Sequence, residues 1–337
     1  MKNKLIPIII ILILIGAGAY YFDRYYLKGN SSKVVEKASV DDIKTTKDTK
    51  DQNVKNTADS LIYLAGSEGT KEIISINAEG QNKKILYTDR DEALKIRSLS
   101  HVAYLSFEAL AYVSADNSKS GKFYIIKLDQ SGKKDEIDNI FEPSSISISP
   151  DGQQIAYVVF SNAEINYGNN ILLVNRKGEN RREIFHSDES ISSLSFSPDS
   201  KSVAFVKSDN QGKSVISKVN IDSAKENQIF SASTPIPAIS WSKDNKIIFT
   251  KSDTKYETGE IIEMDADGKN DKKIMETKNG LGVYAIFSGD GLNIAYIAVT
   301  FNGKFEKNAE GDIKVSSNLG QNINKIGSGS MILGWLP

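Results

Sequence analysis

The hydrophobic positions of this chain gather in short β-rich runs, and successive runs are separated by turns rich in aspartate, asparagine and glycine. Around Ile155, Tyr157 and Val159, apolar residues alternate with smaller or polar ones, which puts one face of a strand against a core. Pro150-Asp151-Gly152 supplies a fixed φ, a side chain that caps its own backbone and a residue free to adopt positive φ. The pattern therefore predicts tight β-hairpins. The strongest copies are residues 146–158, 193–206, 239–250 and 285–297.

These hairpins recur with a regular period. Each is followed by a second hairpin, as at residues 71–87, 169–185 and 259–275. The second strands of the units align at Leu61, Leu110, Ile155, Val203, Ile247 and Ile294, with spacings of 44 to 49 residues. Four short strands repeated at such a spacing are typical of a β-propeller. Six units predict an all-β fold with six blades.

The two ends of the repeat region complement each other. Residues 61–64 match the second strand of a unit, whereas residues 332–337 match a first strand. Trp335 falls where Phe196, Trp241 and Phe287 fall in the other units. We therefore expect the N- and C-terminal strands to pair in one shared blade, which closes the ring and removes free strand edges. A solenoid of stacked β-units is the alternative, but it would not require the divided unit.

The connections between strands predict two different faces of the propeller. The tight glycine turns join strands one to two and three to four, and they lie on one face. The connections between strands two and three, and between blades, lie on the other, which we call the long-loop face. Its longest loops are residues 160–170, 250–259 and 298–311. Binding residues often lie in long loops on a rigid scaffold.

Five aromatic residues stand out in these long loops. Such side chains either anchor a partner or pack back onto the edge of the blade, and both interpretations stay open. The candidate binding residues are Phe160, Tyr167, Tyr256, Phe301 and Phe305.

The N-terminal part of the chain differs in composition from the repeats. Residues 5–22 form an apolar run preceded by two lysines, which as a helix spans about 27 Å and predicts a membrane anchor with the following residues outside the cytoplasm. A cleaved signal peptide is the alternative, with secretion after cleavage near Ala19. Residues 23–59 are polar and lack periodicity, which predicts a flexible linker. The predicted organisation is 1–22 anchor or signal, 23–59 linker and 60–337 propeller.

Composition restricts the chemistry that the chain can perform. Forty-two basic and forty-three acidic residues are spread over all units with a net charge of −1, so nucleic acid is not an expected partner. The absence of cysteine excludes disulfides and thiolate sites. The two histidines, His101 and His186, lie in different units without a nucleophile elbow, and we interpret them as surface or turn residues.

One segment resembles the beginning of a calcium-binding loop. Glu263, Asp265, Asp267 and Gly268 place acids on alternate residues before a glycine, but Ile274 stands where the closing acid is required. Turn chemistry explains the segment more simply. The sequence therefore predicts no catalytic residue, no metal site and no cofactor.

The repeats resemble those of a known family. Ser149-Pro150-Asp151-Gly152 before Ile155-Ala156-Tyr157, and Ser197-Pro198-Asp199 before Val203-Ala204-Phe205, are similar to the repeats of TolB-type propellers, also described as WD40-like or PD40 repeats. The resemblance covers roughly residues 60–337 and implies the fold. Members of this family bind other envelope proteins, as TolB does in the Tol-Pal system. Related repeats occur in dipeptidyl peptidase IV-like and prolyl oligopeptidase-like enzymes.

Two differences from these relatives shape the functional expectation. The chain has no small α/β domain before the propeller as TolB has, and no hydrolase domain after it, so we expect neither membership in the Tol-Pal complex nor peptidase activity. We expect a non-catalytic, membrane-tethered propeller outside the cytoplasm that binds a cell-envelope or membrane protein through the long-loop face. The alternatives are an enzyme with a site at the mouth of the central channel, such as a lyase, lactonase or glycan hydrolase, and a glycan-binding sensor module.

Overall fold

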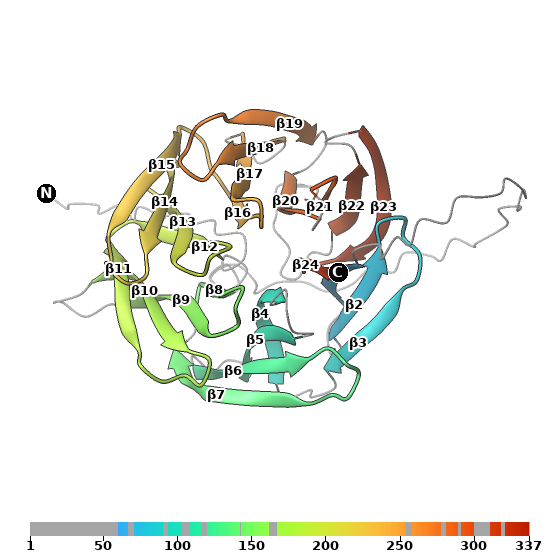
Figure 1. Ribbon diagram of the computed structural model, residues 1–337, viewed down its shortest axis with the longest axis horizontal. Coiled ribbons are helices and arrows are strands. Elements are labelled where there is room, and N and C mark those ends of the chain that lie inside the picture. The colour runs from blue at the N-terminus through green and yellow to red at the C-terminus, as the bar shows by residue number, and fades with distance from the viewer. Residues whose placement is uncertain are drawn as a thin grey trace, which may run out of the picture.

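The computed structural model describes a ring of β-sheets. The described residues are 60–66, 71–89, 94–102, 108–115, 120–141, 143–161, 167–253, 258–277, 281–288, 291–299, 311–317 and 321–336. Their strands form six four-stranded antiparallel sheets that surround a common axis as blades (Figure 1). The predicted β-propeller is confirmed.

The first sheet combines strands from both ends of the chain. In the next two sheets, the order of the strands from the ring centre outwards is their order along the chain. The first contains β24 (Met331–Leu336), β1 (Ser60–Ala65), β2 (Lys71–Asn77) and β3 (Lys84–Asp89). The second contains β4 (Leu94–Val102), β5 (Glu108–Ala115), β6 (Ser120–Lys127) and β7 (Lys134–Phe141). The third contains β8 (Ser145–Ile148), β9 (Gln154–Ser161), β10 (Gly168–Asn175) and β11 (Arg182–Ser187).

The remaining three sheets repeat the same order. The fourth contains β12 (Ser190–Phe196), β13 (Ser202–Ser208), β14 (Ser214–Asn220) and β15 (Glu226–Ala232). The fifth contains β16 (Ala238–Trp241), β17 (Lys246–Ser252), β18 (Gly259–Asp265) and β19 (Lys272–Thr277). The sixth contains β20 (Leu281–Phe287), β21 (Asn293–Val299), β22 (Gly311–Ser317) and β23 (Gln321–Gly329).

The pairing register confirms the alignment of the repeats. In four sheets, a large aromatic residue of the inner strand pairs with the second-strand residue at which the sequence units align. These backbone pairs are Phe196 with Val203, Trp241 with Ile247, Phe287 with Ile294, and Trp335 with Leu61. The sequence period therefore corresponds to one blade.

The second strand of a blade is buried on both faces, whereas the sequence pattern predicted one buried face. In β9, Ile155 and Tyr157 pack in one cluster, while Ala156 and Val158 on the opposite face pack in another. Each blade lies between two neighbours, so both of its faces are covered. A strand buried on both sides has a nearly continuous apolar sequence, and small residues such as Ala156 fit where the next sheet approaches.

Six hydrophobic clusters fill the spaces between neighbouring blades among the described residues. Each cluster draws its members from two adjacent sheets, including the pair formed by the sixth and first sheets. No single central core is required, because the faces of the sheets are the surfaces that lose contact with water. The stability of the ring therefore depends on every interface between blades.

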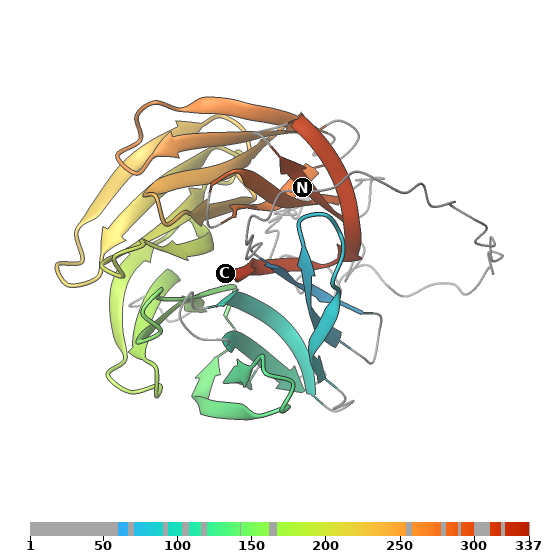
Figure 2. The same ribbon diagram turned by 45° about the vertical axis from the view of Figure 1, so that its right-hand side comes forward.

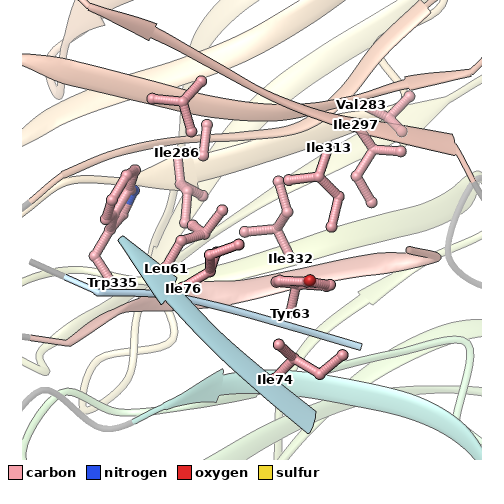
Figure 3. Packing of buried hydrophobic residues seen from close by; sticks show 12 residues of the cluster. Leu61, Tyr63, Ile74, Ile76, Val283, Ile286, Ile297, Ile313, Ile332 and Trp335 are labelled. Atoms are coloured by element: carbon pink, nitrogen blue, oxygen red, sulfur yellow. The ribbon is translucent and has the colours of Figure 1, made fainter. Parts of the chain in front are cut away.

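The ring closes by pairing of the chain ends, as the sequence predicted. β24 pairs antiparallel with β1, from Ser60 opposite Leu336 to Leu64 opposite Met331. Trp335 is 3% exposed and shares a cluster with Tyr63, Leu61 and Ile286. Figure 3 shows these side chains between the sheets. In the turned view of Figure 2, the β2–β3 hairpin (blue) runs beside the outer strand β23 (red), where Gly80 lies against Ile326.

The predicted anchor at residues 1–22 and the predicted linker at residues 23–59 lie outside the described residues. Within the described part of the chain, no helix is long and apolar enough to cross a membrane.

Candidate functional site

The tight turns lie between strands one and two, as predicted, and are held by their own side chains. Gly152 has φ of +69° and its N–H donates to the carbonyl of Ser149 at 2.8 Å. Ser149 Oγ donates to Asp151 Oδ1, and the same contact recurs between Ser197 and Asp199 at 2.6 Å. The Ser197 hydroxyl is the main cause of the lowered pKa of Asp199. These polar groups stabilise turns, so they explain the repeated motif without a ligand.

The long-loop face of the third blade carries an exposed aromatic pair, Phe160 and Tyr167. Phe160 is 51% exposed and Tyr167 is 58% exposed. Their ring centroids are 5.3 Å apart with an interplanar angle of 84°, an edge-to-face arrangement. Of the five predicted binding residues, the structure brings these two together. Tyr256, Phe301 and Phe305 lie outside the described residues.

The position of the aromatic pair corrects the predicted loop boundaries. Phe160 belongs to β9, and its backbone lies opposite Asn169 of β10. Tyr167 directly precedes β10, so the connection between the strands is shorter than the predicted 160–170. The pairing of β9 with β10 is regular from Ser161 opposite Gly168 to Gln154 opposite Asn175. The pair is therefore carried by two regularly paired strands. Its rings are exposed and are not buried against the blade edge.

Gly168 fixes the path of the chain next to Tyr167. Its φ is +134°, and a Cβ atom there would approach the Ser187 carbonyl oxygen to 2.6 Å and His186 Cε1 to 3.1 Å. Only glycine accommodates this backbone conformation and this close approach to β11. Tyr167 is consequently held beside the end of the outer strand.

Two acidic residues, Asp188 and Glu189, directly follow β11 at the same end of the blade. Asp188 has a side chain that is 88% exposed, and Glu189 is also exposed. The backbone N–H of Glu189 donates to Ser187 Oγ at 3.0 Å. Asn169 Nδ2, from the residue opposite Phe160, donates to the Glu189 carbonyl at 3.0 Å. These hydrogen bonds hold the turn of Asp188 and Glu189 against β10. We call these two residues the acidic corner.

His186 contributes to the same end of the blade. Its Nδ1 lies 2.8 Å from Asn170 Oδ1, and its Nε2 lies 3.6 Å from Asp188 Oδ1. The amide oxygen can only accept, so Nδ1 is the donor in this contact. Asn170 is 3% exposed, which anchors the imidazole at the blade end. The sequence interpretation of His186 as a surface residue is confirmed. Its backbone lies opposite Asn170, which lies opposite Val159, so the imidazole is on the opposite face of the sheet from Phe160.

The segment that resembled a calcium loop forms a turn. Asp265 accepts from Lys246 and Asn270, and Asp267 accepts from Lys269 Nζ at 2.9 Å. The hydrogen bond from Lys246 is the largest cause of the lowered pKa of Asp265. Among the described residues, no group of three or more His, Cys, Asp or Glu side chains could hold a metal ion.

The comparisons with known proteins agree with this architecture. The model of the TolB beta propeller domain family matches residues 105–319, which is more than half of the chain. No curated protein sequence matches the chain.

Solved structures with the same fold share little sequence with the chain. The putative TolB of Agrobacterium tumefaciens matches with 16% identity and a TM-score of 0.63, covering 80% of this chain and 92% of that one. TolB of Acinetobacter baumannii matches with 16% identity and a TM-score of 0.62, covering 83% of this chain and 66% of that longer one. A chain of a nidogen/laminin complex matches with 10% identity and a TM-score of 0.59, covering 82% and 97%.

At these identities the structural matches establish the fold alone. The family match rests on the repeats themselves, which the register of the sheets places at equivalent positions in successive blades. The chain belongs to the TolB β-propeller family.

Proposed function

We propose that this protein is a non-catalytic binding scaffold that holds a cell-envelope protein through the long-loop face of its third blade. The observation that carries the proposal is the exposed aromatic pair, Phe160 and Tyr167. Exposed aromatic side chains on a rigid support are frequent anchors of protein interfaces, since they offer a large contact area at a low cost in conformational entropy.

The surroundings of the pair support binding rather than incidental exposure. Beneath Phe160, Val158 is fully buried in the cluster between the third and fourth blades. Two aromatic groups mounted on such a support lose little freedom when a partner covers them. The scaffold is therefore organised before the partner arrives.

The proposal includes attachment to a membrane. Residues 5–22 would serve as the anchor and residues 23–59 as the linker, which places the propeller outside the cytoplasm and close to the bilayer. Both segments lie outside the described residues, and the support for this part is the sequence: an apolar run after two lysines, followed by a polar stretch.

Capture of the partner by the full chain tests the proposal. Tagged protein in detergent-solubilised membranes is cross-linked, and the bound proteins are identified for the wild type and for the Phe160→Ala/Tyr167→Ala variant. We expect the wild type to capture one envelope protein, and the captured amount to fall by at least about tenfold in the double variant. Truncation of interface aromatics commonly lowers affinity by that much.

Leu292→Ala is the matched control. Leu292 is 59% exposed and lies in the β20–β21 turn, on the face opposite the long loops. This variant should capture the same protein as the wild type. Equal capture by the double aromatic variant, or loss caused by Leu292→Ala alone, would contradict the proposed surface.

A further inference from the structure

The outer strands of the first three blades begin with pairs of basic residues on the face that carries the tight turns, which we call the tight-turn face. β3, β7 and β11 start at Lys84, Lys134 and Arg182, and the residue before each of them is also basic. Figure 1 shows these strands at the periphery of consecutive blades. All six side chains are exposed, and we call them the basic rim: Lys83, Lys84, Lys133, Lys134, Arg181 and Arg182.

The first two blades bring their parts of the basic rim together. Gln130 lies in the turn that also carries Lys133, and its Nε2 donates to the carbonyl oxygen of Ile85, the residue after Lys84, at 3.2 Å. Most of these cations are not neutralised within the protein. The members of the rim that form no ion pair within the described structure are Lys83, Lys84, Lys133 and Arg182.

Nearby acidic residues reduce the positive charge of the basic rim without reversing it. Each of the three turns carries one acid, Glu79, Asp129 or Glu179, but the third turn also carries Arg176 and Lys177. Further acids follow the basic pairs along the outer strands, about 3–7 Å farther from the tight-turn face. These residues are Asp135, Glu136 and Glu183. The ends of the three blades therefore keep an excess of positive charge.

The charge changes sign from one end of the outer strands to the other. β11 starts with Arg182 on the tight-turn face and is followed by the acidic corner on the long-loop face. β3 likewise runs from Lys84 to Asp89. The two faces of these blades thus differ in the kind of charged surface that they favour.

The chain also enters the ring on the tight-turn face. Ser60, the first residue of β1, pairs with Asn77, where the turn between β2 and β3 begins, and with Leu336 at the end of β24. Whatever precedes Ser60 therefore reaches the propeller from the side of the basic rim. With residues 5–22 as the proposed anchor, this is the side on which the membrane is attached.

Resting on the membrane anchor of the proposed function, we infer that the basic rim docks on an anionic lipid surface. The long-loop face and its aromatic pair then point away from the bilayer. Lysine and arginine side chains are attracted to anionic headgroups within about one Debye length, roughly 10 Å. The tether keeps the rim at a high effective concentration near the lipid, so a modest attraction is sufficient. The acids of the long-loop face oppose the reverse orientation.

Distance measurements on the full-length protein in lipid nanodiscs test this orientation. The chain has no cysteine, so one introduced cysteine carries one dye. Gln81→Cys labels an exposed position on the tight-turn face, and Asn210→Cys labels an exposed position between β13 and β14 on the long-loop face. Energy transfer to acceptor lipids is compared in phosphatidylcholine alone and in a mixture with phosphatidylglycerol. We expect phosphatidylglycerol to raise transfer from the dye at position 81 by at least about twofold at low salt, and to change transfer from position 210 little.

A pair of matched variants locates the contact. Lys83→Gln/Lys84→Gln should remove at least about half of the rise caused by phosphatidylglycerol. Lys272→Gln/Lys273→Gln, at the start of β19, removes the same charge from the same face and should remove little of it. The reason is that this pair is already neutralised: Lys272 lies 3.1 Å from Glu263, and Lys273 pairs with Glu260 at 3.4 Å and with Glu276. Equal transfer in the two lipid compositions, or equal losses in the two variants, would overturn the inference.

The other outcomes separate this inference from the proposed scaffold function. If phosphatidylglycerol has no effect while the double aromatic variant loses the envelope protein, the scaffold stands and the lipid contact is wrong. If the rim docks on phosphatidylglycerol but no captured protein depends on the aromatic pair, the lipid contact stands and the scaffold is wrong. A chain that associates with neither nanodisc contradicts both the anchor and the lipid contact. Binding of soluble dextran sulfate without a response to phosphatidylglycerol would assign the rim to an acidic polymer and overturn the lipid contact.

Discussion

At the scale of single residues, glycines in the hairpin turns differ in how closely they approach the neighbouring blade. Gly268 has φ of +84°, and a Cβ atom at this position would lie 2.1 Å from the carbonyl oxygen of Ile229 in the preceding blade. Gly212 has the same φ of +84°, but nothing lies within 4 Å of its virtual Cβ. Both glycines adopt a positive φ that disfavours other residues, but only Gly268 closely contacts the neighbouring blade.

This difference gives a prediction with an internal control. Gly212→Ala should lower the free energy of unfolding by about 1–2 kcal/mol, the cost of a left-handed alanine. Gly268→Ala should cost at least about 2 kcal/mol more, because the backbone of the neighbouring blade must move. Denaturant unfolding of both variants measures the difference, and equal losses would refute the importance of the contact.

At the scale of elements, the outer strands share an irregularity. In five sheets the register between the third and fourth strands shifts by one residue, which leaves one aliphatic residue of the outer strand without a partner opposite it. These residues are Leu86, Ile184, Ile229, Ile274 and Ile326. Two of them, Ile229 and Ile326, lie against the turn glycines Gly268 and Gly80 of the next blade. Such a bulge re-aims side chains, here toward the adjoining hairpin.

The inner strands are joined across blades by serine side chains. Ser195 Oγ on β12 accepts the backbone N–H of Trp241 on β16 at 3.0 Å, and Ser193 Oγ accepts from Ile239 at 2.8 Å. Ser145 Oγ on β8 likewise accepts from Leu194 on β12 at 3.1 Å. Since inner strands have no strand partner on the side of the ring axis, these hydroxyls satisfy N–H groups that would otherwise lack an acceptor.

Ser195→Ala and Ser147→Ala should therefore differ, although both serines are buried at equivalent positions. Ser195→Ala removes the acceptor of a buried N–H and should cost about 1–3 kcal/mol of unfolding free energy. Ser147 Oγ is buried without a hydrogen-bond partner in the described structure, so Ser147→Ala should be neutral or stabilising. Thermal and denaturant unfolding compare the two, and a larger loss for Ser147→Ala would contradict this account.

At the scale of the whole molecule, the ring depends on the contact between its two ends. β24 supplies the inner strand of the first sheet, and its residues Ile332 and Trp335 pack with the sixth sheet in one cluster. The edge that β24 covers on β1 would otherwise expose unpaired backbone groups. Ring closure therefore provides backbone pairing for β1 and burial for the side chains of β24.

Trp335→Ala should consequently lower the free energy of unfolding by about 3–5 kcal/mol, as expected for loss of a buried large aromatic side chain. Ile323→Ala, on the outer strand of the sixth blade and 45% exposed, is the control and should remain within about 0.5 kcal/mol of the wild type. Comparable losses in the two variants would mean that the joint between the chain ends does not limit stability.

Much of the fold could be predicted from the sequence, because its determinants are local. Turn chemistry at Pro150-Asp151-Gly152 acts over a few residues, and the repeat places Val203, Ile247 and Ile294 at corresponding positions of second strands. The divided first blade could also be predicted, since Trp335 matches a first strand and Leu61 a second.

The composition of the candidate site was only partly predictable. Phe160 and Tyr167 stand out in the sequence as aromatics in a polar stretch, but the sequence does not show that their rings contact each other edge to face. Nor does the sequence show which face of the sheet His186 occupies. The bulge in β11 leaves Ile184 out of the pairing, so His186 rather than Phe185 lies opposite Asn170. A shift of one residue exchanges the faces of a strand, and no local pattern in the sequence shows it.

The sequence by itself determined the strands, the turns, the number of units and the closing pair, since each follows from short-range chemistry repeated along the chain. Only the tertiary structure decided that second strands are buried on both faces, because burial depends on the neighbouring blades and not on the strand. It also decided which side chains share a face at the end of the third blade, because pairing between β9, β10 and β11 places Phe160 and Asn169 on one face of the sheet and Asn170 and His186 on the other.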